Sequence, residues 1–409
     1  MNLFWRNVPL LAVSQALMLS SMSLILTVSA LVGASIAPDK SLATLPIAVV
    51  FIAVMITTIP AAMLMERIGR KAGFMLATFA GMSGGVVAMI AVTQGNFWLF
   101  VFSGFLVGIF NGFGNFFRFA AADSVEQDHK SRAISYVLFG GVVAAILGPN
   151  LGILTKDTIG DTQFVGSYLS VACLFIIMFF TLAFLKLPHQ PMLEKRNSNQ
   201  SGRPVLQIMR QPKFIVAMMC AMLGYGTMSF IMTATPLAMH AHTHSLSDTS
   251  FVIQWHVLGM FAPSFVTGHL IRRFGVLKIM FVGGLLGILC VFTNLLGHSV
   301  WHYWLALTLL GISWNFLYIG GTTLLTETYT PEEKGKAQGA NDFIIFTTVT
   351  FSSLTAGVLQ HKFGWQTVNM GVIPLLLAIL ISISWLALKL RQDVIPKQDG
   401  VRDAVHSEL

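Results

Sequence analysis

Twelve long apolar runs follow one another along this sequence of 409 residues, separated by short polar segments. A helix needs about 20 residues to cross the hydrocarbon core of a bilayer, and each run is about that long. Lipid offers no hydrogen-bond partners, so a run of this length must satisfy its own backbone groups as a helix. We therefore expect an all-α membrane protein with twelve transmembrane helices. The runs lie near residues 8–36, 42–64, 73–93, 97–120, 133–153, 164–186, 213–238, 249–270, 276–297, 303–325, 339–359 and 366–389.

The distribution of charge predicts the orientation. Charged residues make up only 10% of the chain, against about a quarter in soluble domains. The net charge of +8 is concentrated in both tails and in every second loop, whereas Lys40, Lys156 and Lys362 fall on the other side. Cytoplasmic loops are enriched in Lys and Arg, so we expect both termini in the cytoplasm of a bacterium, with the chain in its inner membrane. The bilayer, and not nucleic acid, is the expected partner of the basic residues.

Neither a cleaved leader nor disulfides are expected. The first apolar run is too long for the core of a signal peptide, so the first helix should remain in the mature protein. Cys173, Cys220 and Cys290 fall in three separate runs, which argues against a disulfide framework.

A polar stretch in the middle divides the chain into halves. We expect a six-helix bundle over residues 1–187, a cytoplasmic linker over 188–212, a second six-helix bundle over 213–390 and a cytoplasmic tail over 391–409. The loops after the second and eighth runs repeat basic residues and glycine at matching offsets, which indicates pseudo-symmetric halves. The first loop has Glu66, Arg67, Gly69, Arg70 and Lys71, and the second has Gly268, Arg272, Arg273 and Gly275.

These loops resemble the signature of the major facilitator superfamily, a glycine followed by an acidic and a basic residue and then Gly-Arg-Lys. Ala62 stands in place of the first glycine and Glu66 in place of the usual aspartate. The resemblance implies a secondary transporter and not an enzyme, and no run or loop shows a nucleophile with an obvious base. It also implies a cytoplasmic charge clamp. The residues expected in this clamp are Glu66, Arg67, Gly69, Arg70, Lys71, Asp123, Arg272 and Arg273.

The fifth run resembles the glycine–proline motif of the same superfamily. Its small residues recur every four positions, a spacing that lets two helices approach closely, so packing explains them at least as well as any role in transport direction. The residues are Gly140, Ala144, Gly148, Pro149 and Gly152.

Carboxylates are expected only near the cytoplasmic ends of the spans. Asp123, Glu327 and Asp342 lie there, with Arg118 about one turn deeper as their predicted partner. A charge in hydrocarbon is costly and usually functional, so the lack of a mid-membrane carboxylate leaves proton coupling open.

The middle of the membrane offers sulfur and imidazole instead. Met228 and Met232 on the seventh run, and His256 and Met260 on the eighth, are each spaced i, i+4 and therefore share a helix face. Counted from the intervening loop, the two pairs fall at similar depths. Neutral thioether and imidazole ligands suit Cu(I). Pro236, four residues after Met232, predicts local unwinding at this level.

The pattern Met-xxx-Met followed by His-xxx-Met resembles the CcoA-type copper importers, a branch of the superfamily that supplies copper for cbb3-type oxidase assembly. The resemblance implies that copper, as Cu(I), is the transported substrate and not a prosthetic group, and it adds a downstream copper chaperone as a possible partner. We expect a monomer. Weaker accessory positions for metal capture are His240, His242, His244, Met18, Met22 and Cys220.

Two alternatives remain open. The same branch is similar to bacterial riboflavin importers, so the solute could be riboflavin or another small organic molecule held in an aromatic-rich cavity. A membrane-bound copper assembly factor that moves no solute is the alternative of another class.

Overall fold

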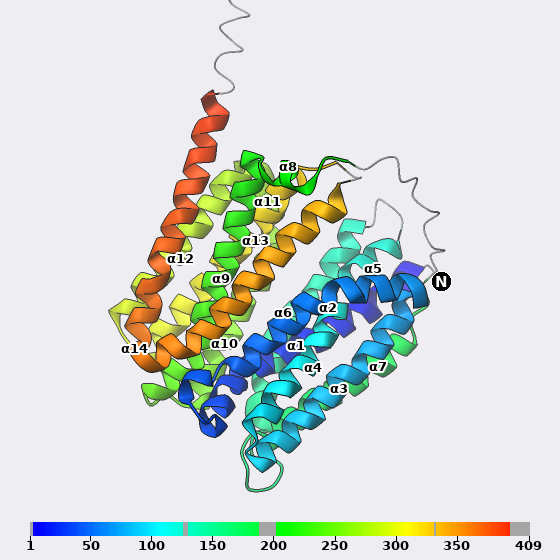
Figure 1. Ribbon diagram of the computed structural model, residues 1–409, viewed down its shortest axis with the longest axis vertical. Coiled ribbons are helices and arrows are strands. Elements are labelled where there is room, and N and C mark those ends of the chain that lie inside the picture. Colours follow the sequence, from blue (N-terminus) through cyan, green and yellow to red (C-terminus); the bar gives the residue numbers. More distant parts are fainter. Residues whose placement is uncertain (1–2, 126–129, 188–201, 331–332, 393–409) are drawn as a thin grey trace, which may run out of the picture.

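The computed structural model describes residues 3–125, 130–187, 202–330 and 333–392, and every regular element in these ranges is helical. Figure 1 shows two bundles side by side, the N-terminal one in blue and cyan and the C-terminal one in green to red. The predicted tail lies outside the described residues, except for its first two positions, and so does much of the predicted linker.

The N-terminal bundle contains the first six spans, and α4 with α5 makes up the fourth of them. Large aromatic side chains fill its core, where the rings of Phe74 and Phe110 pack on Phe117, and the ring of Phe175 packs on Phe110. Its elements are α1 (Leu3–Ile36), the 3-10 helix η1 (Lys40–Leu42), α2 (Leu45–Ile68), α3 (Arg70–Gln94), α4 (Phe97–Gly114), α5 (Phe117–Asp123), α6 (Lys130–Leu154) and α7 (Val165–Ala183).

The C-terminal bundle contains the other six spans. The short helix α8 precedes it, α10 and α11 together form its second span, and α14 bends at Gly364, where φ is 76°, so that it crosses twice. Its elements are α8 (Val205–Met209), α9 (Pro212–Ala241), α10 (Leu246–Phe261), α11 (Ser264–Phe274), α12 (Val276–Leu296), α13 (Val300–Thr326) and α14 (Lys334–Gln392).

The prediction of twelve spans is confirmed. Within the described ranges, ten helices are long and apolar enough to cross a bilayer. Counting the two arms of α14 separately, and α10 with α11 as one span, gives twelve.

The two halves are built alike. In the first half α1 packs on α6, α2 on α4 and α3 on α7; in the second α9 packs on α14, α10 on α13 and α12 on α14. The linking glycines also match, because Gly69 has φ 86° and ψ 148° and Gly275 has φ 89° and ψ 148°. A side chain is strained in this region of positive φ, which explains a glycine at the same place in both halves. The halves meet through α2 with α14, α6 with α10 and α1 with α9.

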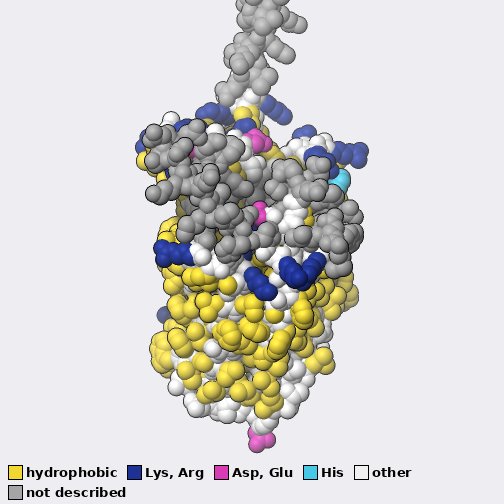
Figure 2. Space-filling view, turned by 90° about the vertical axis from the view of Figure 1, so that its right-hand side faces the viewer, with side chains coloured by type: hydrophobic (Ala, Val, Ile, Leu, Met, Phe, Trp, Pro, Cys, Tyr) yellow, Lys and Arg dark blue, Asp and Glu magenta, His cyan; other side chains and the backbone are white. Residues whose placement is uncertain are grey.

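Figure 2 shows a broad belt of hydrophobic side chains across one face of the molecule, with lysine and arginine gathered mostly above it. Isolated exposed apolar residues are ordinary, but a continuous belt fits contact with lipid. We call the end that carries Arg67, Arg70, Arg272, Arg273 and Lys389 the basic end. The end formed by the loops before α2, α4, α7, α10 and α13 is called the opposite end.

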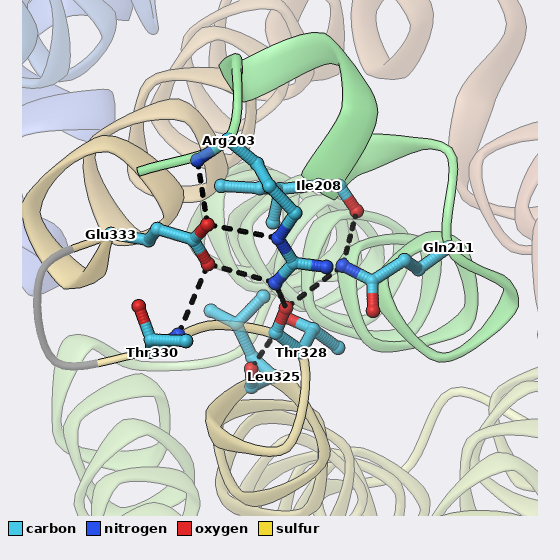
Figure 3. A network of polar contacts seen from close by, with 7 residues as sticks. All are labelled: Arg203, Ile208, Gln211, Leu325, Thr328, Thr330 and Glu333. Carbon is cyan, nitrogen blue, oxygen red and sulfur yellow. Dashed lines mark hydrogen bonds and ion pairs between the residues drawn. The ribbon is translucent and has the colours of Figure 1, made fainter. Parts of the chain in front are cut away.

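An ion pair fixes the end of the linker to the C-terminal bundle, as Figure 3 shows. Glu333, only 3% exposed, accepts hydrogen bonds from the backbone N–H and the guanidinium of Arg203, each 2.8 Å long. Arg203 also donates to the carbonyl of Thr328, which accepts a second bond from Gln211. Gly202 lies so close that a Cβ there would be 2.5 Å from Glu333 Cγ. Hydrogen bonds from Arg203 lower the pKa of the Glu333 carboxyl to about 2.

Glu333→Gln is expected to lower the thermal unfolding temperature of the purified protein by several degrees, because a neutral amide cannot replace a paired, buried carboxylate. Because its folded pKa is depressed, this carboxylate stabilises the protein fully above about pH 4.5 and loses its effect as pH falls towards 2. The matched control is Glu327→Gln, which removes the exposed pair with Lys213 and should change the unfolding temperature by about one degree or less. Equal shifts in both variants would contradict the expectation.

Candidate solute-binding site

A cavity of about 570 Å³ lies between the two bundles and reaches towards the basic end. It is lined by α1, α2, α4, α5 and α6 from the first half and by α9, α10, α13 and α14 from the second. Transporters built from two repeats tend to hold their solute at the interface between the repeats. This central cavity is therefore the candidate site.

Aromatic side chains form its C-terminal side. Trp314 and Tyr318, one turn apart on α13, stack with ring centroids 4.8 Å apart and planes 10° apart. Tyr225 of α9 packs edge-on against both rings, at 5.3 Å and 79° for Trp314 and at 5.7 Å and 84° for Tyr318. We call Tyr225, Phe261, Trp314, Tyr318 and Phe346 the aromatic wall. Such a surface offers flat faces and edges for a planar ring.

Polar side chains line the N-terminal side. Gln15, Ser23 and Asn111 lie in the wall of the cavity, where they can hydrogen-bond a solute. Towards the basic end the lining includes Arg118 and Asp342, which attract each other electrostatically. Arg118 and Asp342, one of its predicted acidic partners, thus line the same cavity. The site combines an apolar aromatic side with a polar side, as small-molecule pockets usually do.

Three of the four predicted copper ligands line this cavity, and the fourth does not. Met228, Met232 and Met260 are in its wall. His256 is fully buried, and its Nδ1–H donates a 2.8 Å hydrogen bond to the Leu307 carbonyl of α13. Within the described part of the chain, its Nε2 has no hydrogen-bond partner. The imidazole is therefore held against α13 and is not part of the cavity lining.

The predicted unwinding at Pro236 is wrong. Helix α9 continues from Pro212 to Ala241 with Pro236 inside it. The interruption lies in the next span, at Ala262 and Pro263 between α10 and α11. A proline costs one helical hydrogen bond, and α9 tolerates that loss because its neighbours pack it on several sides.

The residues predicted as accessory metal-capture positions do not lie together in the structure. Met22 lines the central cavity, whereas Met18 is buried in the core of the first half. Cys220 is buried in the core of the second half. All three cysteines are free, and Cys173 is exposed, whereas Cys220 and Cys290 are buried.

The loop histidines lie at the opposite end, away from the central cavity. His240 and His244 line a second chamber there. The ring of His242 stacks on His298 with centroids 4.1 Å apart and lies 2.9 Å from the Tyr303 hydroxyl. Burial, together with His298, lowers the pKa of His242. Among the described residues, no three His, Cys, Asp or Glu side chains are grouped to hold a metal ion.

The predicted charge clamp lies at the basic end. Arg70 pairs with Asp123 at 2.6 Å and so joins the start of α3 to the end of α5. Lys71 donates to the carbonyl of Ala183 at the end of α7. Arg67, Arg272 and Arg273 are exposed, and the side chain of Glu66 lies outside the described part of the chain.

The glycines of α6 lie against α1. A Cβ at Gly140 would be 2.7 Å from the Ala16 nitrogen, and a Cβ at Gly148 would be 2.6 Å from the Ser20 carbonyl oxygen. Gly152 faces Val28 more loosely, at 3.3 Å, and Pro149 lies inside the helix. Helix α6 therefore packs closely on α1 through its small residues.

The two halves touch at the opposite end, through a contact that no sequence pattern predicted. The Thr44 hydroxyl of the first half donates to the Ser353 carbonyl at 2.8 Å and accepts from the Gly357 N–H at 3.2 Å. Apolar side chains seal the space beneath this contact. The buried members of this plug are Ala30, Ile47, Phe51, Ala221, Ile345 and Val349. We call the Thr44 contacts and the plug the closed gate.

Comparison with known proteins identifies the class of protein. The family model of the Major Facilitator Superfamily matches residues 11–234 and 214–407, and the chain belongs to this superfamily. It is therefore a membrane transporter and not an enzyme. The crystal structure of the Escherichia coli fucose:proton symporter FucP has the same fold, with a TM-score of 0.62, 16% identity, and coverage of 92% of this chain and 98% of that one.

Two of the relatives that match most of the chain are a riboflavin transporter and an uncharacterized transporter. The riboflavin transporter RfnT of Brucella anthropi is 42% identical over 378 residues, which cover 92% of this chain and 95% of the relative. The uncharacterized MFS-type transporter YdeG of Bacillus subtilis is 26% identical, with coverage of 92% and 91%. These matches support the superfamily but not the narrower resemblance to CcoA-type copper importers, since the relative at 42% identity is a riboflavin transporter.

Proposed function

We propose that this protein imports riboflavin, or a closely similar flat heteroaromatic solute, across the bacterial inner membrane with its basic end in the cytoplasm. The aromatic wall is the observation that supports this proposal most directly. A flavin has a planar ring system that can stack on such a wall and a hydroxylated chain that can bond to the amides of the other side. A cavity of about 570 Å³ is within the usual range for small-molecule sites.

Two further observations support the proposal. A relative that is 42% identical over nearly its whole length is a riboflavin transporter. The lysines and arginines gathered at the basic end follow the rule that cytoplasmic loops are positive, so the central cavity would face the cytoplasm in this state.

Copper import is the weaker candidate. Its support is the three methionines in the cavity wall. Its difficulty is that His256 is bonded to α13 and lies outside the lining. Three thioethers can hold Cu(I) without an imidazole, so a direct test has to separate the two solutes.

Expression in a riboflavin auxotroph without flavin uptake is expected to restore growth on low riboflavin and saturable uptake of the labelled vitamin. Met228→Leu with Met232→Leu should leave this uptake within about threefold of wild type, because leucine nearly conserves the volume of methionine. Copper content of the same cells is the second readout. The proposal fails if wild-type protein gives no flavin uptake, and copper import replaces it if cellular copper rises with expression and both leucines abolish that rise.

A further inference from the structure

The structure contains a second chamber, of about 810 Å³, between the two bundles at the opposite end. It is lined by the ends of α1, α3 and α9, by η1, by the part of α14 just before its bend, by the loop between α6 and α7 and by the start of α10. The polar side chains that matter for its chemistry are Lys40, Lys156, His240, His244, Gln360 and His361.

This second chamber lies directly beyond the closed gate. Gln360 follows Gly357 by one turn of α14, and Lys40 precedes Thr44 by four residues. Thr44 and Gly357 are the two residues whose hydrogen bond joins the halves. A solute that enters from the opposite end therefore meets this chamber before the gate and the central cavity.

Every ionisable side chain among the described lining residues of the chamber is a lysine or a histidine. Two lysines and three histidines line it, and no carboxylate is among its described lining residues. Four carboxylates are next to lining residues in sequence: Asp39, Asp157, Asp161 and Asp248. Asp161 is exposed, and Asp248 accepts hydrogen bonds from the backbone N–H and the hydroxyl of Ser245. Asp157 is 3.5 Å from Lys156 and more than half exposed, and Asp39 accepts a 2.8 Å hydrogen bond from the Ser41 N–H. This bond is the main reason why the pKa of Asp39 is lowered.

Gln360 provides a second, independent indication of a ligand. The residue is 9% exposed, and its amide oxygen has no hydrogen-bond partner among the residues that the structure describes. A buried acceptor without a partner is unusual and costs free energy. A ligand hydroxyl would supply the missing donor.

We propose that the second chamber binds a small organic anion that also has hydroxyl groups, and holds it at the mouth of the transport path. Lys40 and Lys156 attract the phosphate or carboxylate, and the low-dielectric walls of the chamber strengthen this attraction. Gln360 accepts a hydrogen bond from a hydroxyl group. This site is distinct from the central cavity and does not depend on which solute the central cavity transports.

Riboflavin 5′-phosphate is a suitable probe because it differs from riboflavin by one anionic group. Its binding to the full chain in nanodiscs of phosphatidylcholine, which has no net charge, can be titrated by quenching of flavin fluorescence at pH 7. The double variant Lys40→Gln with Lys156→Gln is expected to bind the ester at least fivefold more weakly than wild type. Gln360→Leu, which removes the acceptor but no charge, should weaken binding severalfold.

The matched control is Lys362→Gln, an exposed lysine next to His361 that does not line the chamber. Inorganic phosphate should displace the ester from wild type and not from the double variant, which identifies the phosphate as the group recognised. The proposal is overturned if the double variant binds the ester as tightly as Lys362→Gln. A wild-type protein that binds the ester but does not import riboflavin would refute the proposed function alone.

Discussion

Gly357→Ala is expected to reduce solute uptake at least tenfold by preventing the halves from closing at the opposite end. A Cβ at this position would be 2.5 Å from the Thr44 hydroxyl oxygen and 3.0 Å from its Cγ2, closer than atoms approach without displacement. Alanine is a better helix former than glycine, so α14 itself should fold normally. Overpacking costs about 1–3 kcal/mol. This cost is enough to change the equilibrium between the state closed at the opposite end and the state open there by roughly 5- to 150-fold. The protein would then remain open at the opposite end.

Accessibility of the plug measures this shift directly. Ala30 is fully buried in the plug, so Ala30→Cys in a chain whose three native cysteines are serine should react slowly with an impermeant maleimide added to intact cells. Addition of Gly357→Ala should increase the labelling rate severalfold. Thr44→Ala in the same chain removes the clashing atoms and should restore protection. Gly371→Ala, on the same helix and with no atom of the described residues within 4 Å of the new Cβ, is the matched control. Unchanged labelling in the Gly357 variant would refute the closed gate.

The fold could be predicted from the sequence because lipid imposes one strong requirement on every span. Run length and charge distribution sufficed for the twelve helices, and the paired loops around Gly69 and Gly275 predicted the repeat. The helix break at Ala262 and Pro263 was not predicted, and local unwinding was wrongly expected at Pro236. The reason is that a proline in the sequence indicates only the loss of one helical hydrogen bond. Whether the helix then bends depends on the helices packed against it.

The candidate site was harder to predict than the fold. The spacing of residues along a helix gives their depth in the membrane and shows which of them share a helix face, but it does not give the rotation of that helix relative to its neighbour. Met228, Met232 and Met260, which the spacing placed on facing helix surfaces, line one cavity. The spacing failed for His256, whose ring faces the Leu307 carbonyl 51 residues later in the chain. The i, i+4 spacing of Trp314 and Tyr318 was a usable signal for the aromatic wall. The contact between Thr44 and Gly357 joins residues 313 positions apart, and no local pattern marks it.

Trp314→Ala is expected to lower the apparent affinity for riboflavin by about tenfold or more, with a smaller effect on the maximal rate. Stacking on one aromatic ring contributes about 1–3 kcal/mol in the binding of flat bases, equivalent to roughly 5- to 150-fold in affinity. Trp314 also holds its neighbours in the aromatic wall in position, because it stacks on Tyr318 and packs edge-on with Tyr225. Its loss should therefore weaken the contact that both neighbours make with the solute.

Ring-retaining variants separate stacking from simple loss of packing. Trp314→Phe and Tyr318→Phe keep an aromatic face and should bind riboflavin within about threefold of wild type, because the stacking surface remains. Trp98→Ala removes a tryptophan that is 61% exposed on the outer surface and should leave uptake unchanged. Initial uptake rates over a range of riboflavin concentrations, corrected for the amount of protein in the membrane, give both parameters. If Trp314→Ala and Trp98→Ala take up riboflavin with the same apparent affinity, the aromatic wall does not bind the solute, because only one of these rings faces the cavity.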